Sequence, residues 1–581
     1  MLNLGAEAAN FFEDFFSVSL PLQQSEVVGV KTFFVLGGEN WGMINLLMDY
    51  LVVTETTPLE RRQRVTRLIG HEICHQWFSD WISIEWWNSL WLKEGTCRYL
   101  EYFFMDAVFP GWGLWNAFQC NIMNGALLAD ADPHETHPVD CCNPSPRRIY
   151  DSFHAISCGK GACVLRMLFS IIGVEWLKRA THLLMVRFAG RAINANDFVD
   201  CIADTAEEAC SGEAQLRHAK AIDCCLRIVN AVSHPYLYMN HRPGASYTIT
   251  QYMPPSKQRG LLVVYLQLQR SKASAPVIGF LSTSVRASFE WTPETTLSRV
   301  ATSSSIPLRA VQWTPGRCDS AHLLFLEEAE HHFACPASAS TQRATVGNLL
   351  EPPGPAGVGA GVVPVAAASS PTQQAPSSSP PSGAAGGMWY FNRGGSGFFQ
   401  CDYDAATWHH LFSFVAFSPG EGRMVITMHF ISHSKVQLRR QPGDTGDRCT
   451  FEWLLRLTGT PGTMNSFLWE LVTHALTTLV QLVQEYHCHS MVRAFVNSLY
   501  VPLQRCGELS FFAQEKTVAF QCSIHLSRQL RAPHPAASMS LRQPGGCDGG
   551  GGRGDAVVNG GAAVAQRLAA PHIRRLIQHH R

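Results

Sequence analysis

The stretch between Thr57 and Glu101 constrains the fold more than any other part of this chain. Thr57-Pro-Leu-Glu60 has the pattern of a capping box with a proline in the first helical turn, so it predicts that a helix begins there. The helical pattern then continues through Phe78. Within it, His71 and His75 are four residues apart and therefore lie one turn apart on the same helix face.

Two histidines at this spacing can hold one metal ion through their imidazoles. Glu72 is rotated by about 100° from His71 around the helix axis. Its carboxylate can therefore reach a water molecule on the ion without binding the ion itself. HExxH on a helix is typical of a zinc peptidase, in which Glu72 is the general base.

A catalytic zinc site needs a third protein ligand and one open position. Glu94 offers that ligand from an apolar, tryptophan-rich segment, where an unpaired carboxylate would be costly to bury. We expect Asn88 to cap a second helix that turns Glu94 inward, with Glu101 on the same face. The prediction is one Zn²⁺ per chain, bound by His71, His75 and Glu94. The alternative, two core histidines on a buried helix, leaves Glu94 unexplained.

These segments resemble the catalytic core of the M1 family of zinc aminopeptidases, which are gluzincins and include the puromycin-sensitive and aminopeptidase N types. The likeness rests on His71-Glu-Ile-Cys-His-Gln-Trp-Phe78, Glu85-Trp-Trp-Asn88 and Leu90-Trp-Leu-Lys-Glu-Gly95. Upstream, Gly37-Gly-Glu-Asn-Trp-Gly42 is similar to the family's exopeptidase motif, in which Gly-Ala-Met stands where this chain has Leu-Gly-Gly.

The resemblance implies that Glu39, with Gly38 and Asn40 beside it, binds the free α-amine of a peptide substrate. A charge-assisted hydrogen bond at this point restricts cleavage to the first peptide bond. The implied activity is hydrolysis of N-terminal residues from peptides by a zinc-activated water. The alternative is that Glu39 is a turn residue in a Gly-rich loop.

The chain departs from the family pattern at Cys158, which aligns with a tyrosine of the family. The family uses a tyrosine hydroxyl to stabilise the oxyanion, whereas a thiol is a weaker and shorter donor. Tyr150 and His154 lie close by in the sequence but do not align with that tyrosine. Losing an oxyanion donor commonly costs about 10²–10³ in rate. A catalytically impaired member that binds peptides as a scaffold is therefore one rival. A zinc endopeptidase or an epoxide hydrolase of the same fold is another, and an endopeptidase would have no use for Glu39.

Composition divides the chain into parts of a multidomain α+β protein. Short β-rich runs such as Ser246–Tyr252 and Leu261–Leu268 predict strands. The Pro/Ala/Ser/Gly tract after them cannot bury enough apolar surface to become ordered. The predicted parts are a thermolysin-like, mostly helical catalytic domain (1–228) without the family's preceding β-domain, a β-sandwich (229–335 and 388–403), a disordered insert (336–387), a partial, solenoid-like α-helical domain (404–540) and a flexible Gly-rich tail (541–581).

Charge and hydropathy limit the kinds of partner and the location that we expect for this protein. The chain has 46 basic and 46 acidic side chains and a formal net charge of zero. A balanced charge argues against a nucleic-acid partner. The sequence has neither a signal-peptide pattern nor ~18 uninterrupted apolar residues, so we expect a cytoplasmic protein with no transmembrane segment.

Overall fold

The structure is a computed structural model of the whole chain. It describes residues 2–242, except 21, 55–56, 58, 132–134, 141–148 and 210–211. Beyond residue 242 it describes the strands between 246 and 334, residues 388–404, Thr407 and Leu411. The predicted insert (336–387), the predicted tail (541–581) and nearly all of the predicted helical domain (404–540) lie outside the described residues.

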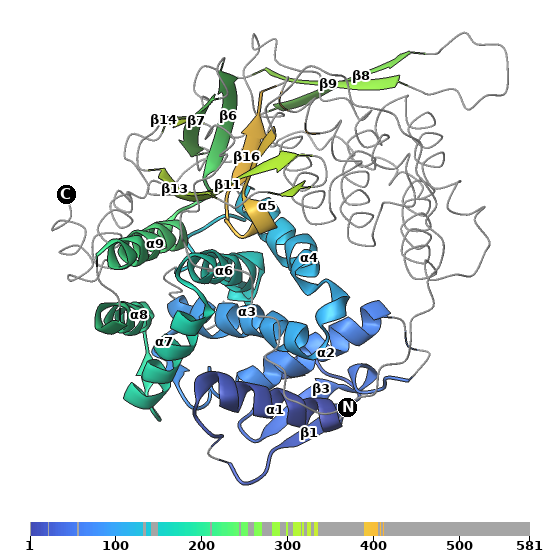
Figure 1. Cartoon of the computed structure of the whole chain (residues 1–581). Coiled ribbons are helices and arrows are strands. Elements are labelled where there is room, and N and C mark those ends of the chain that lie inside the picture. Colours follow the sequence, from blue (N-terminus) through green and yellow to red (C-terminus); the bar gives the residue numbers. More distant parts are fainter. Residues whose placement is uncertain are drawn as a thin grey trace, which may run out of the picture.

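The described chain is a mixed α/β fold that is mostly helical up to residue 230, and strands dominate beyond it (Figure 1). The α-helices are α1 (Leu2–Phe16), α2 (Leu59–Cys74), α3 (Leu90–Val108), α4 (Leu114–Phe118), α5 (Asn124–Ala131), α6 (Gly161–Ile172), α7 (Val174–Arg187), α8 (Ala195–Ala209) and α9 (Glu213–Asn230). Shorter turns are the π-helical η4 (Gln119–Met123) and η7 (Ala155–Lys160) and the 3₁₀ turns η1 (Met48–Tyr50), η2 (Trp87–Ser89), η3 (Pro110–Trp112), η6 (Tyr150–Ser152) and η8 (Arg393–Gly395).

Helix α2 begins at Leu59, directly after the Thr57-Pro signal that predicted it. It ends just before His75, whereas the pattern predicted a helix through Phe78. The reason is that several of the following amides bond to carbonyls three or five residues back rather than four. The N–H of His75 still donates to the carbonyl of His71 at 3.2 Å. The two histidines therefore keep the helical spacing that the sequence predicted.

Helix α3 begins differently from the prediction. It starts at Leu90 with Ser89 in the N-cap position, and the side-chain amide of Asn88 donates instead to Oδ1 of Asp140 at 2.8 Å. Asn88 as the cap is therefore wrong, because a carboxylate far along the chain takes its amide. Glu94 is turned inward as predicted and is 6% exposed. Buried side chains cover nearly every face of α3, as in a central core helix.

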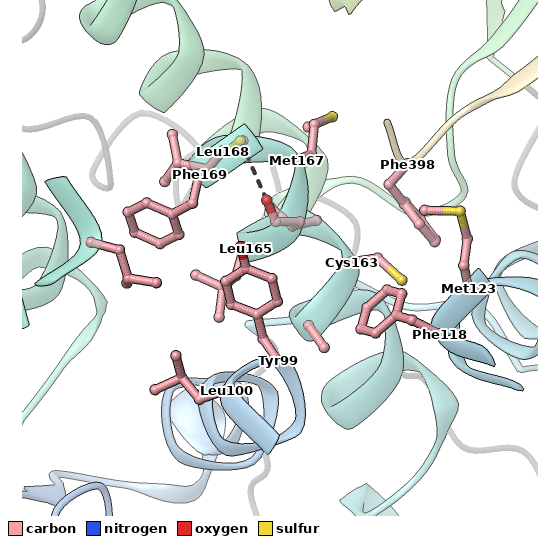
Figure 2. Close-up of a cluster of buried hydrophobic side chains, with 14 of the residues drawn as sticks. Tyr99, Leu100, Phe118, Met123, Cys163, Leu165, Met167, Leu168, Phe169 and Phe398 are labelled. Atoms are coloured by element: carbon pink, nitrogen blue, oxygen red, sulfur yellow. Dashed lines mark hydrogen bonds between the residues drawn. The ribbon is translucent and has the colours of Figure 1, made fainter. Parts of the chain in front are cut away.

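The core of the helical part forms where α3 packs against α6. Figure 2 shows Tyr99 and Leu100 of α3 among apolar side chains of α6, and the rings of Tyr99 and Phe169 stack with centroids 6.3 Å apart. Burying a side chain of leucine or phenylalanine size contributes about 1.5–3 kcal/mol. This packing fixes the position of α3, and therefore of Glu94.

One helical stretch among the described residues, Ala155–Ile172, is long and apolar enough by length and composition to cross a membrane. It consists of η7 and α6, and 83% of it is buried inside the fold, among the side chains that Figure 2 shows. We therefore interpret it as a core helix of this fold.

A small sheet carries the Glu39 segment to the side of α2. Its strands follow the order β1 (Glu26–Val30), β3 (Met43–Leu47) and β2 (Gly37–Gly38). Strand β1 is parallel to β3, and β2 lies antiparallel to β3 at the edge, in contact with α2. The edge strand therefore leads directly into Glu39 beside the helix of the two histidines.

Strands beyond α9 occupy the segments in which alternating runs predicted them. Strands β7 (Ser246–Met253) and β8 (Leu261–Gln269) confirm both of the named runs. In the 388–403 segment, β15 (Met388–Phe391) pairs with β11 (Ile306–Thr314), and β16 (Gln400–Tyr403) pairs with β6 (Tyr236–Arg242). The division into separate domains stays a prediction. The remaining strands are β4 (Ser83–Ile84), β5 (Ala192–Ile193), β9 (Ser282–Glu290), β10 (Ser298–Arg299), β12 (Arg317–Cys318), β13 (His322–Leu326) and β14 (Glu330–Ala334).

Candidate active site

Three buried side chains converge at one point: His71 of α2, His75 directly after α2, and Glu94 of α3. The Nε2 atoms of His71 and His75 lie 3.1 Å apart, and Oε2 of Glu94 lies 3.3 Å and 3.7 Å from them. Each residue is at most 6% exposed. The helices pack against each other, which brings together ligands that are 23 positions apart in the chain.

Protein groups hold the far nitrogens of both imidazoles. Nδ1 of His75 donates to the carbonyl of Phe78 at 2.9 Å, and Nδ1 of His71 lies 2.8 Å from Oε2 of the fully buried Glu101. Partners of this kind fix the tautomer and orientation of metal-binding histidines. The Nε2 atoms are therefore left to face Glu94.

The spacing of these three atoms suits a tetrahedral zinc ion. Zinc–ligand bonds of ~2.0–2.1 Å place neighbouring ligand atoms about 3.3 Å apart, close to the observed 3.1, 3.3 and 3.7 Å. Burial alone would raise the pKa of Glu94, but the charge of His75 and hydrogen bonds from both histidines hold that pKa well below its usual range. Two imidazoles and an ionised carboxylate with a fourth position open form the donor set of a catalytic zinc site.

Glu72 lies beside this group and forms a second cluster with Glu39 and His75. It is 5% exposed, and burial raises the pKa of its carboxyl although the histidine charges oppose the shift. A raised pKa suits a group that must take up and release a proton. A Cβ at Gly37 would overlap the Glu72 carboxylate in this position. Glycine in place of the family's alanine therefore makes room for it.

The Glu39 segment is fastened to the end of α2 by Gln76, which is completely buried. Nε2 of Gln76 donates to the carbonyl of Glu39 at 3.2 Å, and its Oε1 accepts from the N–H of Gly42 at 2.9 Å. Gly42 has a φ of +73°, which glycine adopts without strain. This turn brings the Glu39 carboxylate to within 4.8 Å of the ligand atom of His75.

Lys93 of α3 links Glu39 to the candidate metal ligand Glu94. Its ammonium contacts Oε1 of Glu39 and lies 3.1 Å from Oε1 of Glu94. Burial would raise the pKa of Glu39, but His75 and Lys93 lower it to about 2. Burial likewise disfavours the Lys93 ammonium, but Glu94 and Glu39 keep its pKa above the usual value. Glu39 is therefore ionised and already paired with a cation.

Cys158 lies in η7 and lines the same cavity as the metal ligands. Burial and, after it, the charge of Glu94 raise the pKa of its thiol to about 12. The thiol is therefore protonated at neutral pH. It is also a weak hydrogen-bond donor.

The two neighbours of Cys158 in sequence are engaged elsewhere. Tyr150 is 70% exposed and its ring contacts those of Phe34 and Phe153. Nε2 of His154 lies 2.8 Å from Nε2 of His137, while its Nδ1 accepts the N–H of Ile156 at 3.1 Å. Both line the cavity, and none of the contacts just given involves a candidate ligand.

A cavity of about 1250 Å³ gathers every residue that the sequence singled out for the site. The roles of these residues stay predictions, and the structure shows their proximity. Sequence reasoning missed Gln76, Lys93 and Arg98. Each is a polar residue in a largely buried stretch, which is the signal that pointed to Glu94. The sequence-predicted residues brought together are Gly38, Glu39, Asn40, His71, Glu72, His75, Glu94 and Cys158.

Comparison with known proteins covers this helical part of the chain. Residues 1–217 match the peptidase family M1 domain. The alanine/arginine aminopeptidase of Saccharomyces cerevisiae is 31% identical over 211 residues, which are 36% of this chain and 24% of that protein. Aminopeptidase N of Oryctolagus cuniculus is 33% identical over 196 residues (32% and 20%), and aminopeptidase M1 of Arabidopsis thaliana is 32% identical over 180 residues (31% and 20%). The chain thus spans about a fifth to a quarter of the length of the relatives that it matches.

Proposed function

Since residues 1–217 belong to peptidase family M1, we propose that this protein is a zinc-dependent aminopeptidase that acts on peptides with a free N-terminus. One observation carries the proposal. The convergent ligands His71, His75 and Glu94 share a cavity with the acid Glu72 and the anchor Glu39. This arrangement combines a metal site, a proton acceptor and a carboxylate for an amine.

The proposed roles follow from this arrangement. Zinc bound by His71, His75 and Glu94 would lower the pKa of a water to near 7 and polarise the scissile carbonyl. Glu72 takes a proton from the attacking water and delivers it to the leaving amine. Glu39 holds the α-ammonium of the substrate, so that the first peptide bond is presented for cleavage.

A second candidate is a catalytically impaired scaffold that binds peptides. The observation in its favour is Cys158, whose thiol is protonated and weakly donating where the family has a tyrosine hydroxyl. An endopeptidase is less well supported, because Glu39 lies beside His75 and would block the passage of a continuing chain at that end.

The test compares fluorogenic aminoacyl substrates with and without an N-acetyl group, using protein whose zinc content has been measured. We expect one zinc per chain, cleavage of the unblocked substrate alone, and loss of activity with a chelator that added zinc restores. Glu72→Gln should lower kcat by about 10²–10⁴ because it removes the general base, while zinc content stays at one per chain.

Other results would change the assignment. One zinc per chain without turnover would support the scaffold. Cleavage of the acetylated substrate at a similar rate would support an endopeptidase. Full activity in Glu72→Gln would remove Glu72 from the mechanism.

A further inference from the structure

The cavity that holds the candidate site has an acidic part and a basic part. The carboxylates that line it belong to the metal group or to the side of Glu39, namely Glu39, Glu72, Asp80 and Glu94. The arginines that line it are Arg64 and Arg67 of α2 and Arg98 of α3. Among the described residues, four carboxylates and the ammonium of Lys93 therefore line one part of the cavity, and three guanidinium groups line the other.

The contacts of α2 and α3 place these parts on opposite sides of the metal group. Glu94 contacts His75 and His71, whereas Glu101, farther along α3, contacts His71 and Arg67. The two helices therefore run antiparallel at the site. Arg67 precedes His71 by one turn, about 6 Å along the axis, and Arg98 follows Glu94 by one turn.

The amine anchor lies on the other side. Glu39 is held by Gln76, which follows His75 in the chain, and by Lys93, which precedes Glu94 in α3. Its carboxylate oxygen Oε1 also lies 3.5 Å from the hydroxyl of Ser79. Along α2 and the residues that follow it, the order is therefore Arg64 and Arg67, then the candidate ligands His71 and His75, then Gln76 and Ser79, which contact the Glu39 segment.

The basic part retains excess positive charge. Glu101, which has no exposed surface, lies 3.5 Å from Nε of Arg67 and 3.2 Å from Nη1 of Arg98. Its other oxygen lies 2.8 Å from Nδ1 of His71. Within the described part of the chain, neither guanidinium has a second carboxylate within 4.0 Å. One carboxylate thus balances two guanidinium groups, each on a side chain that is 26% exposed and lines the cavity.

We propose that Arg67 and Arg98 form a subsite for a carboxylate that belongs to the residue after the scissile bond. The proposal rests on the proposed function, since it takes Glu39 as the α-amine anchor and His71, His75 and Glu94 as the site of the scissile carbonyl. A peptide bound in this way continues away from Glu39, towards the arginines. One extended residue spans ~3.3–3.6 Å, so a carboxylate on the second residue comes within reach of them.

The chemistry of the subsite defines the substrate class. Guanidinium groups bind carboxylates through paired, charge-assisted hydrogen bonds. The carboxylate is either the C-terminus of a dipeptide or the side chain of aspartate or glutamate at the second position. Either carboxylate lies at the opposite end of the site from the α-ammonium held by Glu39. The cavity therefore selects short peptides with a free N-terminal ammonium and a carboxylate on the second residue.

The experiment measures kcat/KM for two matched pairs of substrates. Alanyl-alanine against alanyl-alaninamide tests the C-terminal carboxylate, and the amides of alanyl-glutamate and alanyl-glutamine test the side chain. We expect the wild-type protein to favour the acid at least tenfold in one pair or both, the scale of a hydrogen bond to a charged group. Arg67→Gln and Arg98→Gln should each remove most of that preference.

Two controls separate charge recognition from folding. Arg61→Gln removes an exposed arginine of α2 outside the cavity lining and should leave the preference unchanged. Arg98→Lys keeps a cation beside Glu101 and should keep part of the preference, even where Arg98→Gln loses stability by melting temperature. A preference that persists when both arginines are replaced by glutamine, or no preference in either pair, overturns the proposal.

A binding measurement keeps this test independent of turnover. Zinc-loaded Glu72→Gln protein should bind alanyl-alanine more tightly than alanyl-alaninamide by calorimetry, and Arg98→Gln in that background should equalise the two. If the wild-type protein shows no turnover, the aminopeptidase proposal fails while this measurement still decides the subsite. Equal binding of acid and amide before Arg98 is changed overturns the subsite, whatever the activity.

Discussion

Helices α2 and α3 form one wall of the cavity, and η6 and η7 form another. On the first wall the candidate ligands and their supports are buried and mutually bonded, from Glu101 behind His71 to Lys93 between Glu39 and Glu94. On the second wall, Cys158 offers a protonated thiol. The residues proposed to hold a metal and an amine are thus assembled more completely than the group proposed to stabilise an oxyanion. Binding of the ground state and stabilisation of the transition state are separate demands.

The largest expected effect comes from completing the second wall. Cys158→Tyr should raise kcat by about 10²–10³, because it restores a hydroxyl donor of the kind whose removal costs that factor. Steady-state kinetics at equal zinc content measures the change. Cys158→Phe is the matched control, since it adds the ring without the hydroxyl and should give no gain. Equal gains in kcat from both substitutions would mean that the site lacks the volume of an aromatic ring, and not a hydrogen-bond donor.

The next prediction concerns how firmly the second wall is held. Lys160 of η7 has no exposed surface, and its ammonium lies 3.0 Å from Oδ1 of Asp130 and 3.0 Å from the carbonyl of Ala231. Lys160→Met leaves the buried Asp130 carboxylate without its ammonium partner, although His234 and Thr136 stay beside it. This should cost about 3–5 kcal/mol in the free energy of unfolding. Chemical denaturation measures this cost. A loss below about 1 kcal/mol, the range of exposed ion pairs, would contradict the buried pair.

The same pair predicts a pH dependence of stability. Burial would raise the pKa of Asp130, but Lys160 and His234 hold that pKa below its usual value. The folded protein therefore gives up this proton more readily than the unfolded chain. The resulting stability is present above the unfolded pKa and is lost as pH falls through the folded pKa. The melting temperature should therefore drop as the pH falls from the unfolded pKa of Asp130 to below its folded pKa. Asp130→Asn should remove this part of the drop.

The smallest expected effect tests the first wall. Lys93→Asn removes the cation that contacts Glu39 and should lower KM for unblocked substrates about tenfold, because a charge-assisted contact of this scale becomes available to the substrate's ammonium. Lys178→Asn, at an exposed lysine of α7, is the control. A higher KM in Lys93→Asn would show that Lys93 positions Glu39 instead of competing for it, and would sharpen the contrast between the walls.

Local pattern was enough to predict that the three candidate ligands converge. The start of α2, the shared face of His71 and His75 and the inward turn of Glu94 follow from helical spacing and from the cost of burying a charge. The cap on Asn88 failed because Asp140 takes its amide. No local period signals such a contact.

The surroundings of Glu39 could not be predicted for the same reason. Gln76 lies 37 positions and Lys93 54 positions from Glu39. Their side chains meet it only because the small sheet, α2 and α3 pack together. The excess charge of Arg67 and Arg98 depends likewise on Glu101 being shared between two helices. Tertiary packing, not propensity, decides these contacts.

The clamp made by Gln76 has a consequence for register. One amide side chain, adjacent in sequence to His75, spans from the carbonyl of Glu39 to the N–H of Gly42. The segment that carries His71 and His75, the end of α2 and the residues just after it, therefore also holds the candidate amine anchor Glu39 in place. If α2 shifts, the candidate ligands and the Glu39 segment shift together. The distance between them, about the length of one residue, is then kept.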